Sequence, residues 1–582
     1  MSACFPAVSS RMAVLVFALC AGESVAALRA DADGKPGSDA KLWLETSLHR
    51  VFPNSPAGTK TELNMPAARS QRLSFQACVR NDGMQPLRVE CSVTGAPDLA
   101  VQVRRVGYVP MPHHTTAVDL SEQDGAGYIP GLVPDPLFPE QSASVGPWEN
   151  QSFWITVTVL ACTQPGLKTL TVRLSADSGR NKEKVILGEM AARIDVRPVT
   201  LQPRHDFPVT HWWQPDALYD WYKIEPFGEK WWQIVEPYIK DMVAHGSSVI
   251  LVPVFHMRRE VVEHPPQLLK VKAPAPGRYD LDFTDVRRFV KLAEHCGVQY
   301  FEFPHLWLYW GVRNPIHVYT REGNRWSLLW PTETEATAEI YRTFLSQYLP
   351  ALHEFLIREG LLERSFFHLS DEPHGDEHFS NYRKARELLK ELAPWMKVMD
   401  ALSEVRYGKV GLTDIPIPIL SSAQDYIDAG IPHWVYFCTG PRGKYLNRLF
   451  DTPLAKIRMA GWLFYRLRAK GFLHWGYGYW YKMETQELLN PFQEGAGGDW
   501  PGIPYGDPFV VYPGAGGPID SIRWEVFAES LQDYALLQTA GVPPDSPLLS
   551  AIKTYSDFPK TEIWLEQTLQ KILGRPLDGN HR

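Results

Sequence analysis

The chain has few cysteines and no large excess of either basic or acidic residues. Both facts exclude several classes of protein. Only 7 of the 582 residues are cysteine and no Cys-x-x-Cys spacing occurs, so neither a zinc ribbon nor a disulfide framework is indicated. Cys78 and Cys91 flank a turn, and they either pair across a hairpin or lie buried as small hydrophobic residues. The 59 basic and 66 acidic residues give a net charge of -7, which offers no basic field for nucleic acid.

Long apolar runs are also missing, which argues against a transmembrane segment. The one notable run, residues 12–21, follows Arg11 and has a length typical of the core of a signal peptide. Small residues at 24–26 then supply a cleavage point. We therefore expect a signal peptide over residues 1–26, a linker over 27–40, and an exported protein that is periplasmic or extracellular.

Aromatic residues and proline are abundant instead, with 20 Trp, 24 Tyr, 26 Phe and 48 Pro. Such a composition suits a stiff, loop-rich protein that offers flat apolar faces with polar edges. From residue 41 to 200 the chain consists of short segments in which apolar and polar residues alternate, separated by turn residues. This pattern predicts an antiparallel β-sandwich as the N-terminal domain.

After residue 200 the pattern changes to strand-like apolar runs that alternate with helices of 3.6-residue period. Eight strand candidates follow one another, at residues 207–213, 249–255, 300–307, 366–370, 397–401, 415–420, 434–438 and 472–480. The alternation predicts a (β/α)8 TIM-type barrel over residues 201–518, and an open doubly wound sheet is the alternative. Residues 519–582 are predicted to form helices packed on the outside of the barrel.

Two adjacent acids, Asp371 and Glu372, directly follow the fourth strand candidate, and Pro373 follows them. The active site of such a barrel lies at the carboxyl ends of its strands. Two carboxylates there can supply the general acid and the stabilising charge that cleavage of a glycosidic bond needs. The alternative is that one of them only caps the next helix or pairs with a nearby base.

Aromatic and polar residues near the ends of the other strand candidates are predicted to bind the substrate. A sugar ring has apolar C–H faces and a rim of hydroxyls, so aromatic walls with a few polar groups suit it. For each aromatic residue alone, packing in the core is the alternative. The candidates are Trp212, His305, Asp400, Tyr436, Trp475 and Tyr479.

The segment Asp371-Glu372-Pro373 resembles the catalytic region of glycoside hydrolase family 123, the β-N-acetylgalactosaminidase family. The resemblance extends over about residues 203 to 537. Its further matches include Trp434-Val-Tyr436-Phe-Cys438, Arg458 with Trp462, Trp475 with Trp480, Tyr512-Pro-Gly514, and Arg523-Trp-Glu525 leading to Asp533-Tyr534. Ser530 stands where the family has glycine, a departure that concerns packing only.

The resemblance implies a retaining, exo-acting β-N-acetylhexosaminidase in which the substrate's own 2-acetamido oxygen attacks the anomeric carbon. Asp371 would then orient and stabilise the acetamido group, and Glu372 would protonate the leaving oxygen and later activate water. Adjacent residues have Cα atoms only ~3.8 Å apart, which suits this division of roles better than two carboxylates on opposite sides of a bond. The resemblance implies no cofactor and no metal.

Three other functions are weighed against this one. The first is a glycosidase for a sugar without an acetamido group, with Asp371 as the nucleophile. The second is a non-catalytic carbohydrate-binding surface protein. The third is a metal hydrolase, because His374, Asp376, Glu377 and His378 follow the acid pair, although the His-Glu-x-x-His order is missing.

Overall fold

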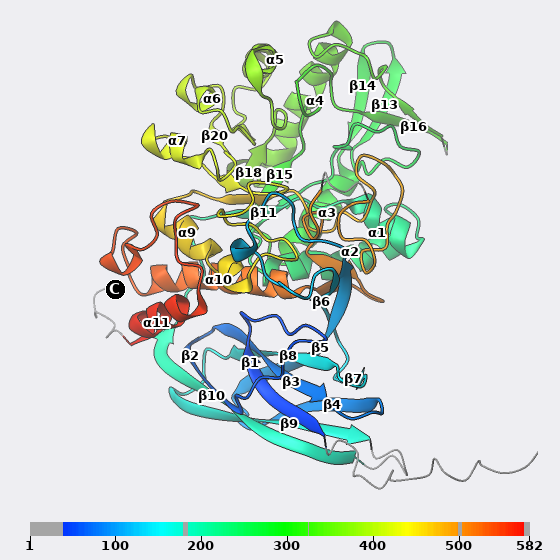
Figure 1. Ribbon diagram of the computed structural model, residues 1–582. Coiled ribbons are helices and arrows are strands. Elements are labelled where there is room, and N and C mark those ends of the chain that lie inside the picture. The colour runs from blue at the N-terminus through cyan, green and yellow to red at the C-terminus, as the bar shows by residue number, and fades with distance from the viewer. Residues whose placement is uncertain (1–38, 178–183, 324, 499–502, 575–582) are drawn as a thin grey trace, which may run out of the picture.

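The computed structural model describes residues 39–177, 184–323, 325–498 and 503–574. The predicted signal peptide and most of the predicted linker lie outside the described residues. Within these ranges, no helix combines the length and hydropathy needed to cross a membrane. The chain has a mixed α/β fold, with a sheet-rich N-terminal region below a larger region of helices and parallel strands (Figure 1).

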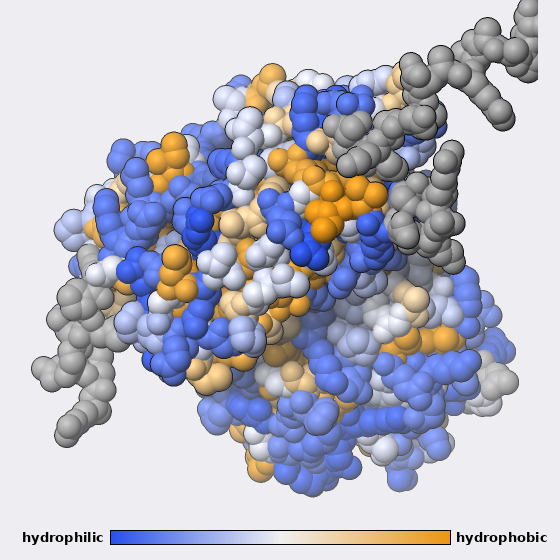
Figure 2. Space-filling view, turned by 90° about the horizontal axis from the view of Figure 1, so that it is seen from below, coloured by the Kyte–Doolittle hydropathy of each residue, from blue (hydrophilic) through white to orange (hydrophobic). Residues whose placement is uncertain are grey.

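The N-terminal region consists of two five-stranded sheets that share a hydrophobic core. One sheet has the order β1 (Ala40–Thr46), β3 (Arg72–Asn81), β8 (Asn150–Val159), β5 (Leu99–Met111) and β6 (Gly131–Phe138). The other has the order β2 (Glu62–Arg69), β10 (Lys184–Thr200), β9 (Gly166–Asp177), β4 (Leu87–Thr94) and β7 (Ser142–Val145). The face seen from below is mostly hydrophilic, with one larger group of hydrophobic side chains and several smaller ones (Figure 2).

One expectation for this region is wrong, and one of the two alternatives for its cysteines is confirmed. The sandwich is not entirely antiparallel, because β10 pairs with β2 in parallel, with Ile194 beside Met65. Cys78 and Cys91 do not face each other across a hairpin, because their strands β3 and β4 belong to different sheets. Both are buried free thiols, and burial raises the pKa of Cys91 to about 12.

Each of the eight predicted strands of the second region overlaps an observed parallel strand that is shorter than predicted, and β18 begins one residue before its predicted range. Six form one sheet in the order β18 (Ser365–Phe367), β15 (Tyr300–Phe303), β12 (Val249–Leu251), β11 (Val209–His211), β22 (Phe472–His474) and β21 (Val435–Tyr436). The other two, β19 (Met399–Asp400) and β20 (Ile415–Pro416), pair with each other. Single parallel bridges, Phe367–Val398 and Ile419–Tyr436, lie at the two junctions between this pair and the larger sheet.

Proline accounts for part of the shortening. Pro253 and Pro304 follow β12 and β15 within two residues, and proline supplies no N–H to a ladder. Three short antiparallel hairpins were not predicted, and they lie in the connections between the parallel strands and the helices. They are β13 (Lys270–Ala275) with β14 (Arg278–Asp282), β16 (Tyr319–Glu322) with β17 (Arg325–Leu328), and β23 (Val511–Pro513) with β24 (Pro518–Asp520).

The helices follow the predicted 3.6-residue pattern, and the buried stripe of α2 begins at Trp231 and ends at Met242. The helices between the parallel strands are α1 (Pro215–Tyr222), α2 (Glu229–Ala244), α3 (Thr284–His295), α4 (Glu339–Arg358), α5 (Gly375–Leu392), α6 (Arg406–Lys409), α7 (Ala423–Asp428), α8 (Leu454–Arg458) and α9 (Ala460–Arg466).

The C-terminal segment contains α10 (Ile522–Thr539) and α11 (Glu562–Leu573). The sequence predicts both on the outside, but α10 is buried along most of its length, between the parallel strands and the N-terminal sheets (Figure 1). Its polar residues are paired on both sides. Glu525 lies 2.5 Å from Arg104 of β5, and the Asp533 carboxylate lies 2.5 Å from Arg458 of α8. Such paired charges let a polar helix be buried, so α10 fixes the two regions against each other.

Candidate active site

Asp371 and Glu372 line a cavity of about 360 Å³ at the carboxyl ends of the parallel strands. Most of the aromatic and histidine candidates line the same cavity, although they come from four different strand ends. They are Trp212, His305, Tyr436, Trp475 and Tyr479. The volume is within the range of small-molecule sites, and the carboxyl ends of parallel strands are where such sites form.

The backbone of Glu372 explains how two adjacent acids reach one cavity. In a regular strand, adjacent side chains point to opposite faces. Glu372 has φ +45°, in the left-handed region that residues with a Cβ rarely adopt, so the strand direction is broken at this residue. Strain of this kind persists where the surrounding contacts hold it, and it is concentrated at functional sites.

The Glu372 carboxylate is held by two aromatic donors from different elements. The Tyr436 hydroxyl, at the end of β21, donates to Oε1 at 2.5 Å. The Trp310 indole N–H, from the loop after β15, donates to Oε2 at 3.3 Å. Each oxygen therefore has one donor, which fixes the plane of the carboxylate in the cavity.

Asp371 has a different electrostatic environment. Burial, and after it the charge of Glu372, raise the pKa of Asp371 well above its usual value. The nearby His368 side chain acts in the opposite direction and lowers it. Asp371 therefore binds a proton more readily than an ordinary aspartate does.

Asp400 is the one predicted substrate-binding residue that does not line the cavity. It is fully buried and accepts hydrogen bonds from the Tyr382 hydroxyl at 2.6 Å and from the Leu369 N–H at 3.1 Å. The next residue, Ala401, lines the cavity instead, because successive side chains of an extended chain point to opposite sides. Asp400 is thus a supporting residue behind the cavity wall.

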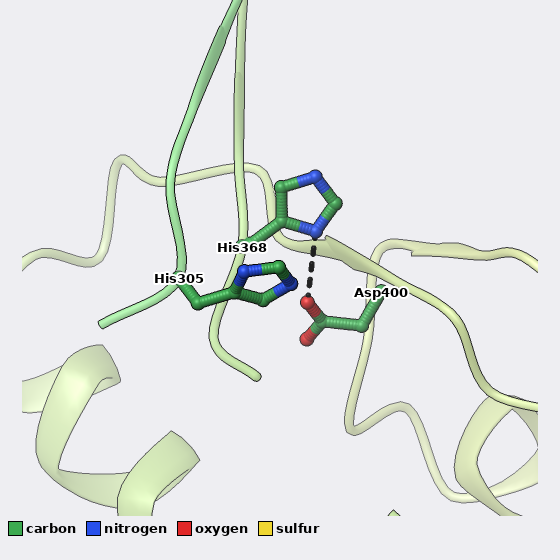
Figure 3. Close-up of side chains that lie close together, drawn as sticks. All are labelled: His305, His368 and Asp400. Carbon is green, nitrogen blue, oxygen red and sulfur yellow. Dashed lines mark hydrogen bonds and ion pairs between the residues drawn. The ribbon is translucent and has the colours of Figure 1, made fainter. Parts of the chain in front are cut away.

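His368, which was predicted only as part of a strand, connects two buried carboxylates behind Asp371. Its Nδ1 lies 3.1 Å from Asp400 and its Nε2 lies 2.5 Å from Glu302 (Figure 3 shows His368 with Asp400). Burial alone would lower the pKa of His368, but the hydrogen bonds to Asp400 and Glu302 raise it to about 10. His368 is therefore an imidazolium at neutral pH and donates to both acids.

Glu302 completes this network below the cavity floor. It also accepts from the Trp212 indole and the Thr210 hydroxyl, each at 2.5 Å, and thereby positions one aromatic wall of the cavity. A charged residue inside the apolar run 300–303 was the available sequence signal for Glu302. It does not show which side chains Glu302 contacts.

Two clusters in the described part of the chain have the composition of a cation site. One is His305, His368 and Asp400, drawn in Figure 3, and its ligand atoms lie within 4.8 Å of one another. Both ring nitrogens of His368 contact carboxylates, and the buried Nε2 of His305 has no hydrogen-bond partner among the described residues. The other cluster is Asp241, His245 and Asp520, and neither contains His374 or His378.

Other cavity residues come from loops whose folding the sequence pattern does not reveal. Among them, Arg258 is buried and forms an ion pair with Asp216 at the start of α1. The rest include Gln214, Met257, Glu260, Tyr309, Trp310, Cys438, Thr439, Met483, Glu484 and Ile503.

The family model described as glycoside hydrolase 123, catalytic domain, matches residues 212–540. A solved family 123 glycoside hydrolase from Clostridium perfringens, described in terms of glycolipid glycan hydrolysis, has a TM-score of 0.70 and 14% identity. That alignment covers 92% of this chain and 97% of the other, so the two share a fold.

A GH2 β-galacturonidase from Eisenbergiella tayi, bound to galacturonate, aligns over 85% of this chain and 73% of its own. Its TM-score of 0.30 and identity of 11% are too low to support an argument. No curated protein matches the chain.

Proposed function

The chain belongs to glycoside hydrolase family 123, and from this premise we propose that it is a retaining, exo-acting β-N-acetylhexosaminidase of the N-acetylgalactosaminidase type. The observation that carries the proposal is the adjacent acid pair, whose two carboxylates line one cavity in different environments. We also propose that the protein is exported, as residues 1–26 suggest. A closed (β/α)8 barrel is proposed too, and the two single parallel bridges at its junctions support it.

In the first step, the acetamido oxygen of the substrate attacks the anomeric carbon as the bond to the leaving oxygen breaks. Glu372 gives its proton to that oxygen and becomes a carboxylate. The hydroxyl of Tyr436, 2.5 Å from Glu372, stabilises the developing negative charge. In the second step, a water attacks the same carbon, Glu372 takes the water's proton, and the acetamido group is released.

Asp371 stabilises the ring formed by this attack, because the acetamido nitrogen gains positive charge while its N–H faces the carboxylate. Asp371 must be ionised for this role, although burial and the charge of Glu372 raise its pKa. Two groups favour ionisation: the His368 imidazolium behind it and the donated N–H of the bound substrate. Binding of an acetamido sugar therefore favours the ionised form of Asp371 that the reaction needs.

The proposal is tested with aryl β-glycosides that differ at carbons 2 and 4. The 2-acetamido substrates should be hydrolysed, their 2-hydroxy analogues should hardly react, and a thiazoline that imitates the cyclised intermediate should inhibit. The galacto configuration should be preferred to gluco. If 2-hydroxy glycosides react equally well, or if a 2-fluoro sugar becomes covalently bound to Asp371, the substrate-assisted mechanism is wrong and Asp371 is a nucleophile.

A further inference from the structure

A second cavity, of about 870 Å³, lies at the amino ends of the parallel strands, whereas the acid pair lies at their carboxyl ends. The residues directly before β11, β12 and β15 line it, namely Pro208, Ser248 and Gln299. Ser70, from the turn between β2 and β3, and Leu531 of α10 also line it. Because the N-terminal region, the parallel strands and α10 all contribute to its wall, we call it the junction cavity.

Arg204 is the one cation in the wall of the junction cavity that lacks an acidic partner among the described residues. The other three are each paired with a carboxylate: Arg72 with Glu525, His245 with Asp241, and His205 with Asp206. Burial lowers the pKa of Arg204 to about 10, and the group that opposes this shift is the Tyr534 phenol, not a carboxylate. The guanidinium is still charged at neutral pH, so a positive charge without a counter-ion lines the cavity.

Backbone carbonyl groups fix the position of the Arg204 guanidinium. Its Nε donates to the Phe207 carbonyl at 3.1 Å, and its Nη2 donates to the Gly246 carbonyl at 2.6 Å. Its Nη1 donates to none of the described residues. Gly246 has φ +92°, and a Cβ there would lie 3.3 Å from Nη1, so glycine leaves this nitrogen accessible. A guanidinium that is held in place with an unpaired N–H edge is suited to bind an anion through charge-assisted hydrogen bonds.

Two serine hydroxyls and two strained residues lie in the same wall. The Ser248 Oγ accepts from the Val209 N–H at 3.1 Å, which leaves its own O–H proton for a ligand. Ser70 has φ +62° and Asp206 has φ +57°, both in the left-handed region. Strain of this kind is concentrated at functional sites, and here it is found in a cavity that is separate from the acid pair.

We propose that the junction cavity binds an oxyanion, a phosphate or sulfate group, through the unpaired edge of Arg204. The anion supplies the counter-charge that this guanidinium lacks, and it stabilises the fold because its site is built from both regions of the chain. The cavity is larger than an oxyanion needs, so the group is either a free ion or part of a larger molecule such as a phosphate monoester. None of these residues lines the active-site cavity, so the inference does not depend on the proposed function.

The test is calorimetric titration of the whole protein with inorganic phosphate, with sulfate and with glucose 1-phosphate, at constant ionic strength. Arg204→Gln removes the charge, and Arg204→Lys keeps the charge but loses the fork of N–H groups. Arg278→Gln is the matched control, because it removes the same charge from the exposed hairpin of β13 and β14. Thermal unfolding with and without phosphate checks that each variant is folded and measures the stabilisation by the anion.

The wild type should bind phosphate and sulfate saturably, with a Kd of about 1 mM or lower, and phosphate should raise its Tm. Arg204→Gln should weaken binding about tenfold or more and abolish the rise in Tm, whereas Arg204→Lys should weaken binding only about three- to tenfold. Arg278→Gln should bind as the wild type does. Tighter binding of glucose 1-phosphate than of inorganic phosphate would assign the site to the phosphate of a larger molecule, and the reverse order would assign it to a free ion.

The inference is overturned if the wild type shows no saturable binding, or if Arg278→Gln weakens binding as much as Arg204→Gln does. It is also overturned if Arg204→Lys binds as tightly as the wild type or as weakly as the glutamine variant. Should the glutamine variant fail to fold, the lysine variant decides by these same two limits.

Discussion

The hydroxyl of Tyr436 should contribute a measurable part of the catalytic power, and its removal is a sharp test of the role of Glu372. Tyr436→Phe keeps the ring, which is 5% exposed, and removes only the donor 2.5 Å from Glu372. Burial, and after it the charge of Glu372, raise the pKa of Tyr436 well above its usual value, so the hydroxyl keeps its proton. A hydrogen bond to a charged group contributes about 1.5–3 kcal/mol. At about 1.4 kcal/mol per factor of ten, kcat/KM should fall about 10- to 150-fold.

The assay is kcat/KM for an aryl 2-acetamido β-glycoside, measured in a cycle with Glu372→Gln. Glutamine keeps the shape of the side chain but bears no charge, so in that background Tyr436→Phe should cost less than about tenfold. Tyr477→Phe is a matched control. Its hydroxyl donates to Asp241 at 2.6 Å, outside the cavity, so this change should lower stability and leave kcat/KM unchanged.

Two results would refute this reasoning. A change of less than about twofold in Tyr436→Phe would mean that the hydrogen bond does not act in the transition state. An equal loss in the wild-type and Glu372→Gln backgrounds would mean that the hydroxyl acts on some other group.

The remaining predictions concern both acids, the buried imidazolium and export. Glu372→Gln should lower turnover about 10²- to 10⁴-fold, with the smallest loss for leaving groups that need no proton. If the first step limits the rate and good and poor leaving groups still lose equally, Glu372 is not the acid. Asp371→Asn should lower kcat strongly, change ground-state binding much less and weaken thiazoline inhibition; an unchanged inhibition constant would contradict its contact with the N–H. The pKa of His368 is about 10 in the folded protein, against an ordinary value of 6.5. Its contribution to stability is therefore complete below about pH 6.5 and is lost as the pH rises toward 10. The Tm of the wild type and the Tm of His368→Gln should converge over that pH interval, whereas a constant difference between them would show that His368 is not charged. N-terminal sequencing of the exported protein should begin near Ala27, and an intact Met1 in that fraction would contradict cleavage there.

Much of the architecture follows from periodicity alone. Apolar runs predict the parallel strands, and the 3.6-residue stripe predicts α2, because burial of one face leaves a regular pattern in the sequence. Pairing between distant segments leaves no such pattern. The charges of α10 show why. Arg523 forms an ion pair with Asp135 of β6, and nothing in the sequence around either residue indicates that the two are paired. The sequence therefore predicts the helix on the outside of the barrel but does not show that the N-terminal region covers it.

The candidate site shows the same division between local signals and contacts that depend on the fold. The acid pair was visible because its chemistry lies in two adjacent residues at a strand end. Asp400 and Ala401 differ by one position, and that single step decides which side chain faces the cavity. Trp310 had no sequence signal beyond its residue type, because its exposure depends on a left-handed backbone and on a hydrogen bond to the carbonyl of Asp371. The acid pair can thus be read from the sequence, whereas the contacts around it depend on the backbone conformation of the loops.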